Sequence, residues 1–181
     1  MNICIYGSAQ DEIDIAYRNA GEVLGKELAL AGHTLVFGGG ACGMMGAVAR
    51  GMKKFGGKII GISPEFFNVD GVLFDECTEM IYTTDMRSRK EKLEEMADAI
   101  IVTPGGIGTM DEFFETMSLK QLKILDKPLI IFNVDGFYDN LIALLQNSTE
   151  KHFIANDDLD LYYVSSEIPK ILEYLEQHKN A

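Results

Sequence analysis

The sequence predicts an α/β fold in which helices cover both faces of a doubly wound, mostly parallel sheet, a Rossmann-like three-layer α/β/α architecture. Short apolar runs alternate with longer helical patterns along the chain. Several of these runs are apolar nearly throughout, which is typical of parallel strands covered on both faces. The chain has 181 residues, of which 47% are hydrophobic. We therefore expect one domain spanning residues 1–181, with no linker or internal repeat.

Six apolar runs are the expected strands, in chain order: Ile3–Tyr6, Thr34–Phe37, Lys58–Ile62, Glu79–Tyr82, Ala99–Val102 and Leu129–Phe132. Leu159–Val164 is a further candidate for a short strand. Helical patterns lie between and after them, at about 13–31, 44–55, 86–97, 109–125, 137–147 and 167–178. Ligands bind beyond the carboxyl ends of the strands in open parallel sheets. Three loops are expected to meet there: Gly7-Ser8-Ala9, Gly38-Gly39-Gly40 and Pro104–Gly108.

Composition limits the classes of partner. The formal net charge is −12, so nucleic-acid polymers and anionic membranes should be repelled, and we expect neither as a partner. A bound anion must then be captured locally, by backbone N–H groups and a few cations. No apolar run approaches the roughly 20 residues that span a bilayer.

The cysteines and histidines do not form a metal-binding pattern. Cys4, Cys42 and Cys77 are odd in number and widely spaced, which favours buried free thiols in a reducing compartment. His33, His152 and His178 are equally scattered, so we expect no metal site. The N-terminal segment is interrupted too early for a signal peptide, and a cytoplasmic location is expected.

The first glycine cluster runs from Gly38 to Gly46. It contains Gly38-x-Gly40-x-x-Gly43, the bare pattern of a dinucleotide site. The cluster follows the second expected strand rather than the first, and no acidic residue for a ribose diol lies near 58–62. An NAD-dependent oxidoreductase is therefore disfavoured. Tight strand–helix packing is the plain alternative, and a backbone that faces a ligand is the favoured interpretation.

The second cluster, Asp85–Lys90, places three cations near a helix N-terminus in an acidic chain. A solvated helix with ion pairs to nearby glutamates would explain it plainly. Cations oppose the helix dipole at this end, however, so a bound phosphate or carboxylate is the alternative. Arg87 and Lys90 are three residues apart and should share a face, whereas Arg89 should point elsewhere.

The third cluster is Pro104-Gly105-Gly106-Ile107-Gly108-Thr109-Met110-Asp111-Glu112, between an apolar strand and a helical pattern. A glycine-rich turn that opens a helix offers N–H groups and a positive dipole end to phosphate. Thr109 and Glu112 also match a capping box, in which Glu112 would only cap the helix. The helix that follows, Phe113–Leu125, is widely apolar, so part of it is expected in a subunit interface.

Together these clusters resemble the LOG-type phosphoribohydrolases, cytokinin-activating enzymes long mislabelled as lysine decarboxylases. Pro104 through Glu112 meet the family pattern P-G-G-x-G-T-x-x-E, and Gly38 through Gly46 meet G-G-G-x-x-G-x-M-G. Met86, Arg89 and Lys90 match M-H-x-R-K, with Arg87 where the family usually has His. The resemblance runs from the first strand to about residue 150.

This resemblance implies hydrolysis of the N-glycosidic bond of AMP or an N6-substituted AMP, giving free base and ribose 5-phosphate without a cofactor. It implies a homodimer or a larger assembly. By motif position, Arg89 and Glu112 are the catalytic pair. The residues expected to bind substrate are Gly7, Ser8, Gly39, Gly40, Met86, Lys90 and, as the phosphate cradle, Gly105, Gly106, Gly108 and Thr109. The residues expected to support these groups from behind are Asp85, Arg87 and Glu115.

The chemistry agrees with these assignments. N-glycoside cleavage passes through an oxocarbenium-like state, and a carboxylate such as Glu112 can stabilise it and orient or deprotonate water. Arg89 does not deprotonate, so its expected tasks are to hold Glu112 ionised and to grip the substrate. Asp85 is a weak candidate for a second acid. Nothing marks a Schiff-base lysine, which disfavours a pyridoxal-phosphate decarboxylase. The runner-up is a non-catalytic nucleotide or molybdenum-cofactor binding protein of this fold.

Overall fold

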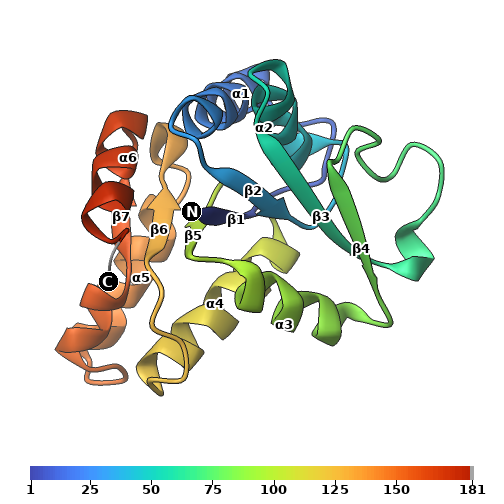
Figure 1. The fold of residues 1–181 in the computed structure, drawn as a ribbon. Coiled ribbons are helices and arrows are strands. Elements are labelled where there is room, and N and C mark those ends of the chain that lie inside the picture. The colour runs from blue at the N-terminus through green and yellow to red at the C-terminus, as the bar shows by residue number, and fades with distance from the viewer. Residues whose placement is uncertain (180–181) are drawn as a thin grey trace.

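The computed structural model describes residues 1–179, which form a seven-stranded parallel sheet between two layers of helices (Figure 1). The strands are β1 (Asn2–Tyr6), β2 (Thr34–Phe37), β3 (Lys58–Pro64), β4 (Glu79–Thr83), β5 (Ala99–Val102), β6 (Leu129–Phe132) and β7 (Tyr163–Ser165). Their spatial order is β4-β3-β2-β1-β5-β6-β7. The doubly wound, three-layer fold class is therefore confirmed.

The direction of winding reverses at β1. The chain steps outward from β1 to β4, returns to the far side of β1 as β5, and then steps outward to β7. Ile3 of β1 lies in register with Leu35 of β2 on one side and Ala99 of β5 on the other. A crevice at such a reversal point, beyond the carboxyl ends of the strands, is the usual ligand site of this architecture.

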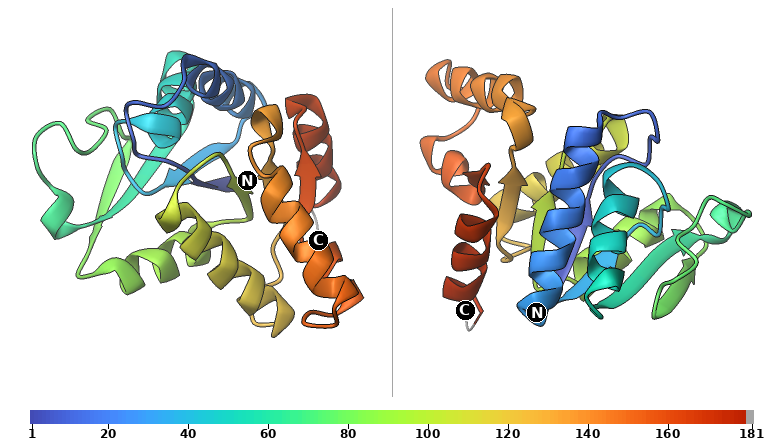
Figure 2. Two further views of the ribbon diagram at one scale, coloured as in Figure 1. Left: turned by 180° about the vertical axis from the view of Figure 1, so that it is seen from behind. Right: turned by 90° about the horizontal axis from the view of Figure 1, so that it is seen from above.

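The helices divide between the two faces of the sheet, as Figures 1 and 2 show. One layer holds α1 (Ile15–Leu30), α2 (Gly43–Lys54) and α6 (Ile168–Gln177), which pack onto one buried apolar cluster. The other holds α3 (Met86–Met96), α4 (Ile107–Gln121) and α5 (Asp139–Glu150), which pack onto a second cluster. The sheet residues belong alternately to the two clusters, because successive side chains of a strand point to opposite faces.

The expected strands match closely, and two elements differ. Leu159–Val164 is not one strand, because residues Asn156–Leu161 form a 3-10 helix and β7 begins only at Tyr163. The helix expected at 109–125 begins at Ile107 and ends at Gln121.

One connection reaches back over the sheet. Between β3 and β4 the chain forms a short 3-10 helix, Glu65–Phe67, and then a loop. The loop is attached to the glycines after β2: the Phe74 N–H donates to the Gly39 carbonyl (2.8 Å), and the Ala41 N–H donates to the Val72 carbonyl (3.0 Å). It thereby forms one wall above the carboxyl edge of the sheet.

Candidate functional site

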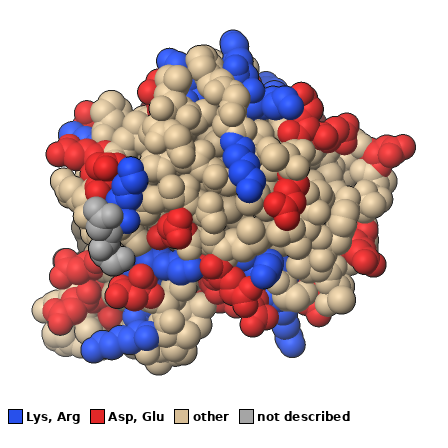
Figure 3. Space-filling view, viewed as in Figure 1, with Lys and Arg blue, Asp and Glu red and all other residues tan. Residues whose placement is uncertain are grey.

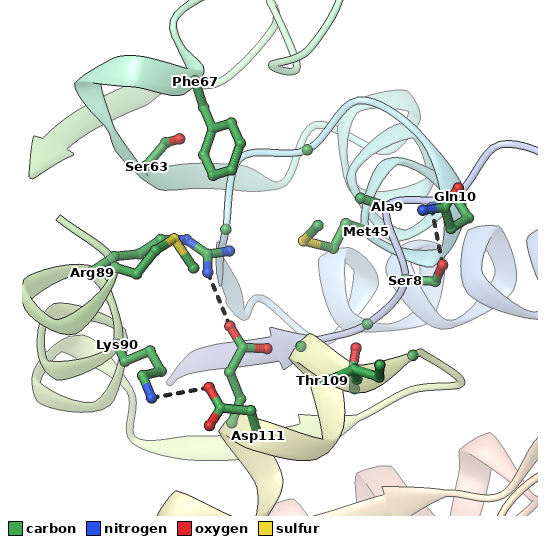
Figure 4. Close-up of a pocket in the computed structure, with 18 of the residues that line it drawn as sticks. Ser8, Ala9, Gln10, Met45, Ser63, Phe67, Arg89, Lys90, Thr109 and Asp111 are labelled. Atoms are coloured by element: carbon green, nitrogen blue, oxygen red, sulfur yellow. Dashed lines mark hydrogen bonds and ion pairs between the residues drawn. The ribbon is translucent and has the colours of Figure 1, made fainter.

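A cavity of about 520 Å³ opens beyond the carboxyl ends of β1, β2, β3 and β5 (Figure 4). Its volume lies within the range of small-molecule sites. Its lining comes from all three expected loops, from β3, from α2, α3 and α4, and from the β3–β4 connection. The lining residues are Gly7, Ser8, Ala9, Gln10, Gly38, Gly40, Met45, Ser63, Phe67, Val72, Leu73, Met86, Arg89, Lys90, Gly106, Ile107, Gly108, Thr109, Asp111 and Glu112.

The N-terminus of α4 faces this cavity. Gly106 is the N-cap residue, and the first helical hydrogen bond is donated by the Met110 N–H to the Gly106 carbonyl (3.0 Å). The N–H groups of Ile107, Gly108 and Thr109 precede that bond, so the helix itself does not use them. They are suited to an anion, with the positive end of the helix dipole behind them.

The alternative of a capping box at Thr109 and Glu112 is wrong. Because α4 begins at Ile107, Thr109 is the third residue of the helix and not its N-cap, and no side chain caps this end. Glu112 lies in the second turn, too far along to reach the N-cap. Its carboxylate is instead directed to Arg89.

The glycine turn before α4 is held from below. The buried Tyr138 hydroxyl donates to the Thr103 carbonyl (2.8 Å). Burial raises the pKa of Tyr138, and a hydrogen bond from the Gly105 backbone opposes this rise. Gly105 itself is packed under Thr109, whose Oγ1 would lie 2.1 Å from a Cβ at that position. This packing fixes the turn from which the three free N–H groups project.

Arg89 and Glu112 form a buried ion pair on the wall of the cavity. Arg89 Nη1 donates to Glu112 Oε1 (3.1 Å), and Arg89 Nε donates to the Ile62 carbonyl at the end of β3 (3.2 Å). Each residue is 8% exposed. The pair joins α3 to α4 across the carboxyl edge of the sheet.

Burial raises the pKa of Glu112 to about 7, and the nearby Arg89 guanidinium opposes that rise. Both the protonated and the ionised form are therefore populated near neutral pH, which is typical of carboxyl groups that act in proton transfer.

Lys90 lies beside this pair at the rim of the cavity. Its ammonium contacts Asp111 Oδ2 (3.0 Å) and the Glu115 carboxylate. The hydrogen bond with Glu115 is the main cause that raises the pKa of Lys90. Lys90 therefore neutralises two carboxylates that would otherwise repel an anion at the start of α4.

The structure places eight of the ten residues expected to bind substrate in the cavity lining, and also both members of the expected catalytic pair. Gly39 and Gly105 lie outside the lining. Gly39 faces Leu73 and Met80, and Gly105 is covered by Thr109. Both shape the loops without facing the cavity.

The expected orientation of the α3 cations is also corrected. The cavity is lined by Met86, Arg89 and Lys90, whereas Arg87 is exposed and outside the lining. Asp85 is likewise outside, as the N-cap of α3: its carboxylate accepts from the Arg87 and Ser88 N–H groups at 2.9 Å each. Hydrogen bonding, first from the Ser88 backbone, lowers the pKa of Asp85. Asp85 thus caps α3, and its carboxylate does not line the cavity.

Several lining residues were not expected. Ser63 is fully buried at the carboxyl end of β3, and the rule that ligands bind at strand ends could have identified it. Phe67, Val72 and Leu73 line the opposite wall. They carry no motif, and only the folded-back course of the β3–β4 connection brings them there.

The charge around the cavity is mixed. The cavity lining includes two cations, Arg89 and Lys90, and two carboxylates, Asp111 and Glu112. Figure 3 shows the opposite side of the molecule, where the strands begin, and acidic and basic side chains are interspersed there as well. Among residues 1–179 no group of three or more His, Cys, Asp or Glu could hold a metal ion. None of the described helices is both long enough and apolar enough to cross a membrane. Cys4, Cys42 and Cys77 are free thiols; Cys4 is buried and the other two are half-buried.

Comparisons with known proteins place the chain among recognised relatives. The family profile described as "Possible lysine decarboxylase" matches residues 45–175. A protein of Oryza sativa subsp. japonica, described as "Probable cytokinin riboside 5'-monophosphate phosphoribohydrolase", is 32% identical over 176 residues, which cover 97% of this chain and 70% of that protein. A cytokinin riboside 5'-monophosphate phosphoribohydrolase of Arabidopsis thaliana is 31% identical over 176 residues, covering 97% and 82%.

A solved structure supports the fold. The molybdenum cofactor carrier protein of Chlamydomonas reinhardtii matches with a TM-score of 0.73 at 19% identity, over 99% of this chain and 98% of that one. At this level of identity the match shows a common fold.

Proposed function

The chain belongs to the LOG family of phosphoribohydrolases, and we propose that it hydrolyses the N-glycosidic bond of AMP or an N6-substituted AMP to free base and ribose 5-phosphate. The observation that carries this proposal is the buried Arg89–Glu112 pair on the wall of a cavity that the open N-terminus of α4 also faces. The N-terminus of α4 suits a phosphate, and the Glu112 carboxylate suits the positive charge that develops on the ribose.

The phosphate binds at the start of α4 in this proposal. Ile107, Gly108 and Thr109, whose N–H groups the helix does not use, line the cavity together with Ser8 from the β1 loop. Lys90 offsets the charges of Asp111 and Glu115 nearby. A phosphate monoester can then approach this helix end although the chain carries a net charge of −12.

Glu112 acts on the ribose. As the bond from C1′ to the base nitrogen breaks, positive charge develops on the sugar, and the Glu112 carboxylate stabilises it at short range in a site of low dielectric. The base leaves with the electron pair of the broken bond. The Glu112 carboxylate accepts a proton from the water that attacks C1′, and this proton passes on to the base, which leaves Glu112 ionised again. Arg89 does not donate a proton. It holds the carboxylate by one oxygen, Oε1, and favours its ionised form.

The test is release of base. The protein is incubated with AMP and with isopentenyl-AMP, and free base is measured by chromatography for wild type, Glu112→Gln and Arg89→Ala. We expect about a 100-fold or larger loss of kcat in Glu112→Gln, the usual scale for removing a catalytic acid–base group. Glu91→Gln, which removes a carboxylate on α3 outside the cavity lining, should retain wild-type activity.

Two outcomes would contradict the proposal. Nucleotide binding without base release in wild type would indicate a non-catalytic binding protein of the same fold. Equal rates in wild type and Glu112→Gln would show that the Glu112 carboxylate takes no part in the reaction.

A further inference from the structure

The Arg89 guanidinium lies against the backbone at the carboxyl edge of the sheet. The Arg89 side chain extends from α3 over the carboxyl ends of β2 and β3, where Ile62 supplies the carbonyl that accepts from Nε. Besides Ile62 and Glu112, the guanidinium also lies next to Gly38, which directly follows β2. A Cβ atom at Gly38 would lie 1.7 Å from Arg89 Nη2, 2.8 Å from Cζ and 3.3 Å from Nε. The guanidinium therefore occupies the space that a side chain at position 38 would need.

The three consecutive glycines after β2 have different surroundings. Gly39 has a φ of +78°, a conformation that disfavours any other residue. Gly40 closely approaches only the flexible end of Met45, at 2.8 Å. Gly38 has no positive φ, and its neighbour is a guanidinium that hydrogen bonds hold in place. The backbone there would accept alanine, so room for the guanidinium is what position 38 provides.

We propose that Gly38 is a positioning residue for the reaction. Because position 38 carries no side chain, the Arg89 guanidinium fits beside it and stays hydrogen-bonded to Glu112. This inference rests on the proposed function. Heavy atoms essentially never approach a Cβ within 3.0 Å, so alanine at position 38 would displace the guanidinium. The displacement would stretch the bonds from Nη1 to Glu112 (3.1 Å) and from Nε to Ile62 (3.2 Å) together, since both depend on one rigid plane.

The experiment is a double-mutant cycle with Gly38→Ala, Arg89→Lys and the combination of both. Lysine lacks the Nη2 arm that alanine would meet. In the wild-type background we expect Gly38→Ala to lower kcat about 100-fold, the scale for misplacing a catalytic group by about 1 Å. In the Arg89→Lys background the same substitution should change kcat less than about threefold, because contacting residues couple and independent ones do not.

The control is Gly61→Ala in β3. A Cβ there would meet the flexible end of Met80 at 2.6 Å, outside the cavity lining. It reports the general cost of a methyl group near this sheet edge and should leave kcat close to wild type. Equal losses from Gly38→Ala in the wild-type and the Arg89→Lys backgrounds would overturn the proposal, because position 38 would then act independently of the guanidinium.

A second readout does not depend on the proposed reaction. In ¹⁵N-labelled protein, the Arg89 side-chain Nε–H should give a slowly exchanging signal, assigned by its loss in Arg89→Lys. Gly38→Ala should abolish or strongly shift this signal, whereas Gly61→Ala should not. An unchanged signal in Gly38→Ala would refute the positioning of Arg89 by Gly38, even if wild type releases no base. A changed signal together with an inactive wild type would support this positioning and refute the proposed function.

Discussion

At the scale of single residues, the site depends on one buried carboxyl group that has one strong partner. Burying a carboxylate is costly unless hydrogen bonds or opposite charges compensate. Glu112 receives a single charged hydrogen bond, on Oε1, from Arg89. Compensation is therefore partial, and the pKa of Glu112 stays near 7 instead of falling below its ordinary value.

This raised pKa predicts an unusual dependence of stability on pH. Between about pH 4.5 and pH 7 the folded protein keeps a proton on Glu112 that the unfolded chain has already lost, so the carboxyl group destabilises the fold as pH rises. Glu112→Gln does not titrate. We expect the free energy of unfolding of Glu112→Gln, minus that of wild type, to increase by up to about 3 kcal/mol from pH 4.5 to pH 7.5.

Denaturant-induced unfolding at several pH values measures this difference. The contributions of groups that titrate in the same way in both proteins cancel when the two free energies are subtracted. The value at low pH reports the constant effect of giving Arg89 an amide partner, and only the slope reports the titration. A difference that is flat with pH, or one that decreases, would show that Glu112 has an ordinary or lowered pKa in the folded protein.

The motifs named ten of the twenty residues that line the cavity, but they did not predict side-chain directions. Arg87, Arg89 and Lys90 lie within one helical turn, and the sequence does not contain the rotation of α3 about its own axis. In the structure Arg89 and Lys90 line the cavity and Arg87 is exposed. That rotation is set by tertiary packing, in particular by the fully buried Leu93 on the same helix.

At the scale of elements, the strands were the most predictable part. Thr34–Phe37, Ala99–Val102 and Leu129–Phe132 have the expected bounds because each is a largely apolar run followed or preceded by turn residues. The start of α4 was not predictable. Thr109 and Glu112 imitate a capping box, whereas the helix begins at Ile107, and the turn before it is held by Tyr138, from a distant part of the chain.

This tertiary support predicts the effect of Tyr138→Phe. The substitution leaves the Thr103 carbonyl without its hydroxyl donor in a buried place, at a cost of about 1–3 kcal/mol. We expect a lower Tm and, because the turn before α4 loosens, a KM for AMP raised several-fold with little change in kcat. Thermal melts and steady-state kinetics measure both quantities.

Tyr82→Phe is the matched control, since Tyr82 is 43% exposed on the edge strand β4. It should leave Tm and KM near wild type. If Tyr138→Phe behaves like Tyr82→Phe, the turn before α4 does not need the hydroxyl for its shape.

At the scale of the whole molecule, the reversal of the sheet at β1 explains why residues distant in sequence form one site. The loops after β1 and β5 meet there: the Ser8 N–H donates to the Pro104 carbonyl (3.1 Å), and the Met45 N–H at the start of α2 donates to the Ser8 carbonyl (3.1 Å). The topology thus brings the three glycine-containing loops together. The wall from the β3–β4 connection was invisible in the sequence because its contacts depend on the antiparallel bridge of Leu73 with Gly40.

The outer surface of α4 leads to the last prediction, self-association. Ile107, Met110 and Phe114 recur at helical spacing and are 88%, 37% and 41% exposed, so they form an apolar stripe beside the cavity. We expect a second copy of the chain to cover this stripe, because exposed apolar stripes of this kind mark protein interfaces. Light scattering at micromolar concentration should give at least twice the mass of one chain for wild type. The combined substitutions Met110→Glu and Phe114→Glu should reduce the measured mass to that of one chain.

Phe153→Glu is the control, because Phe153 is 82% exposed but lies beyond α5, and it should preserve the assembly. A wild-type mass of one chain would refute the interface, and an assembly that survives both α4 substitutions would place it on another face.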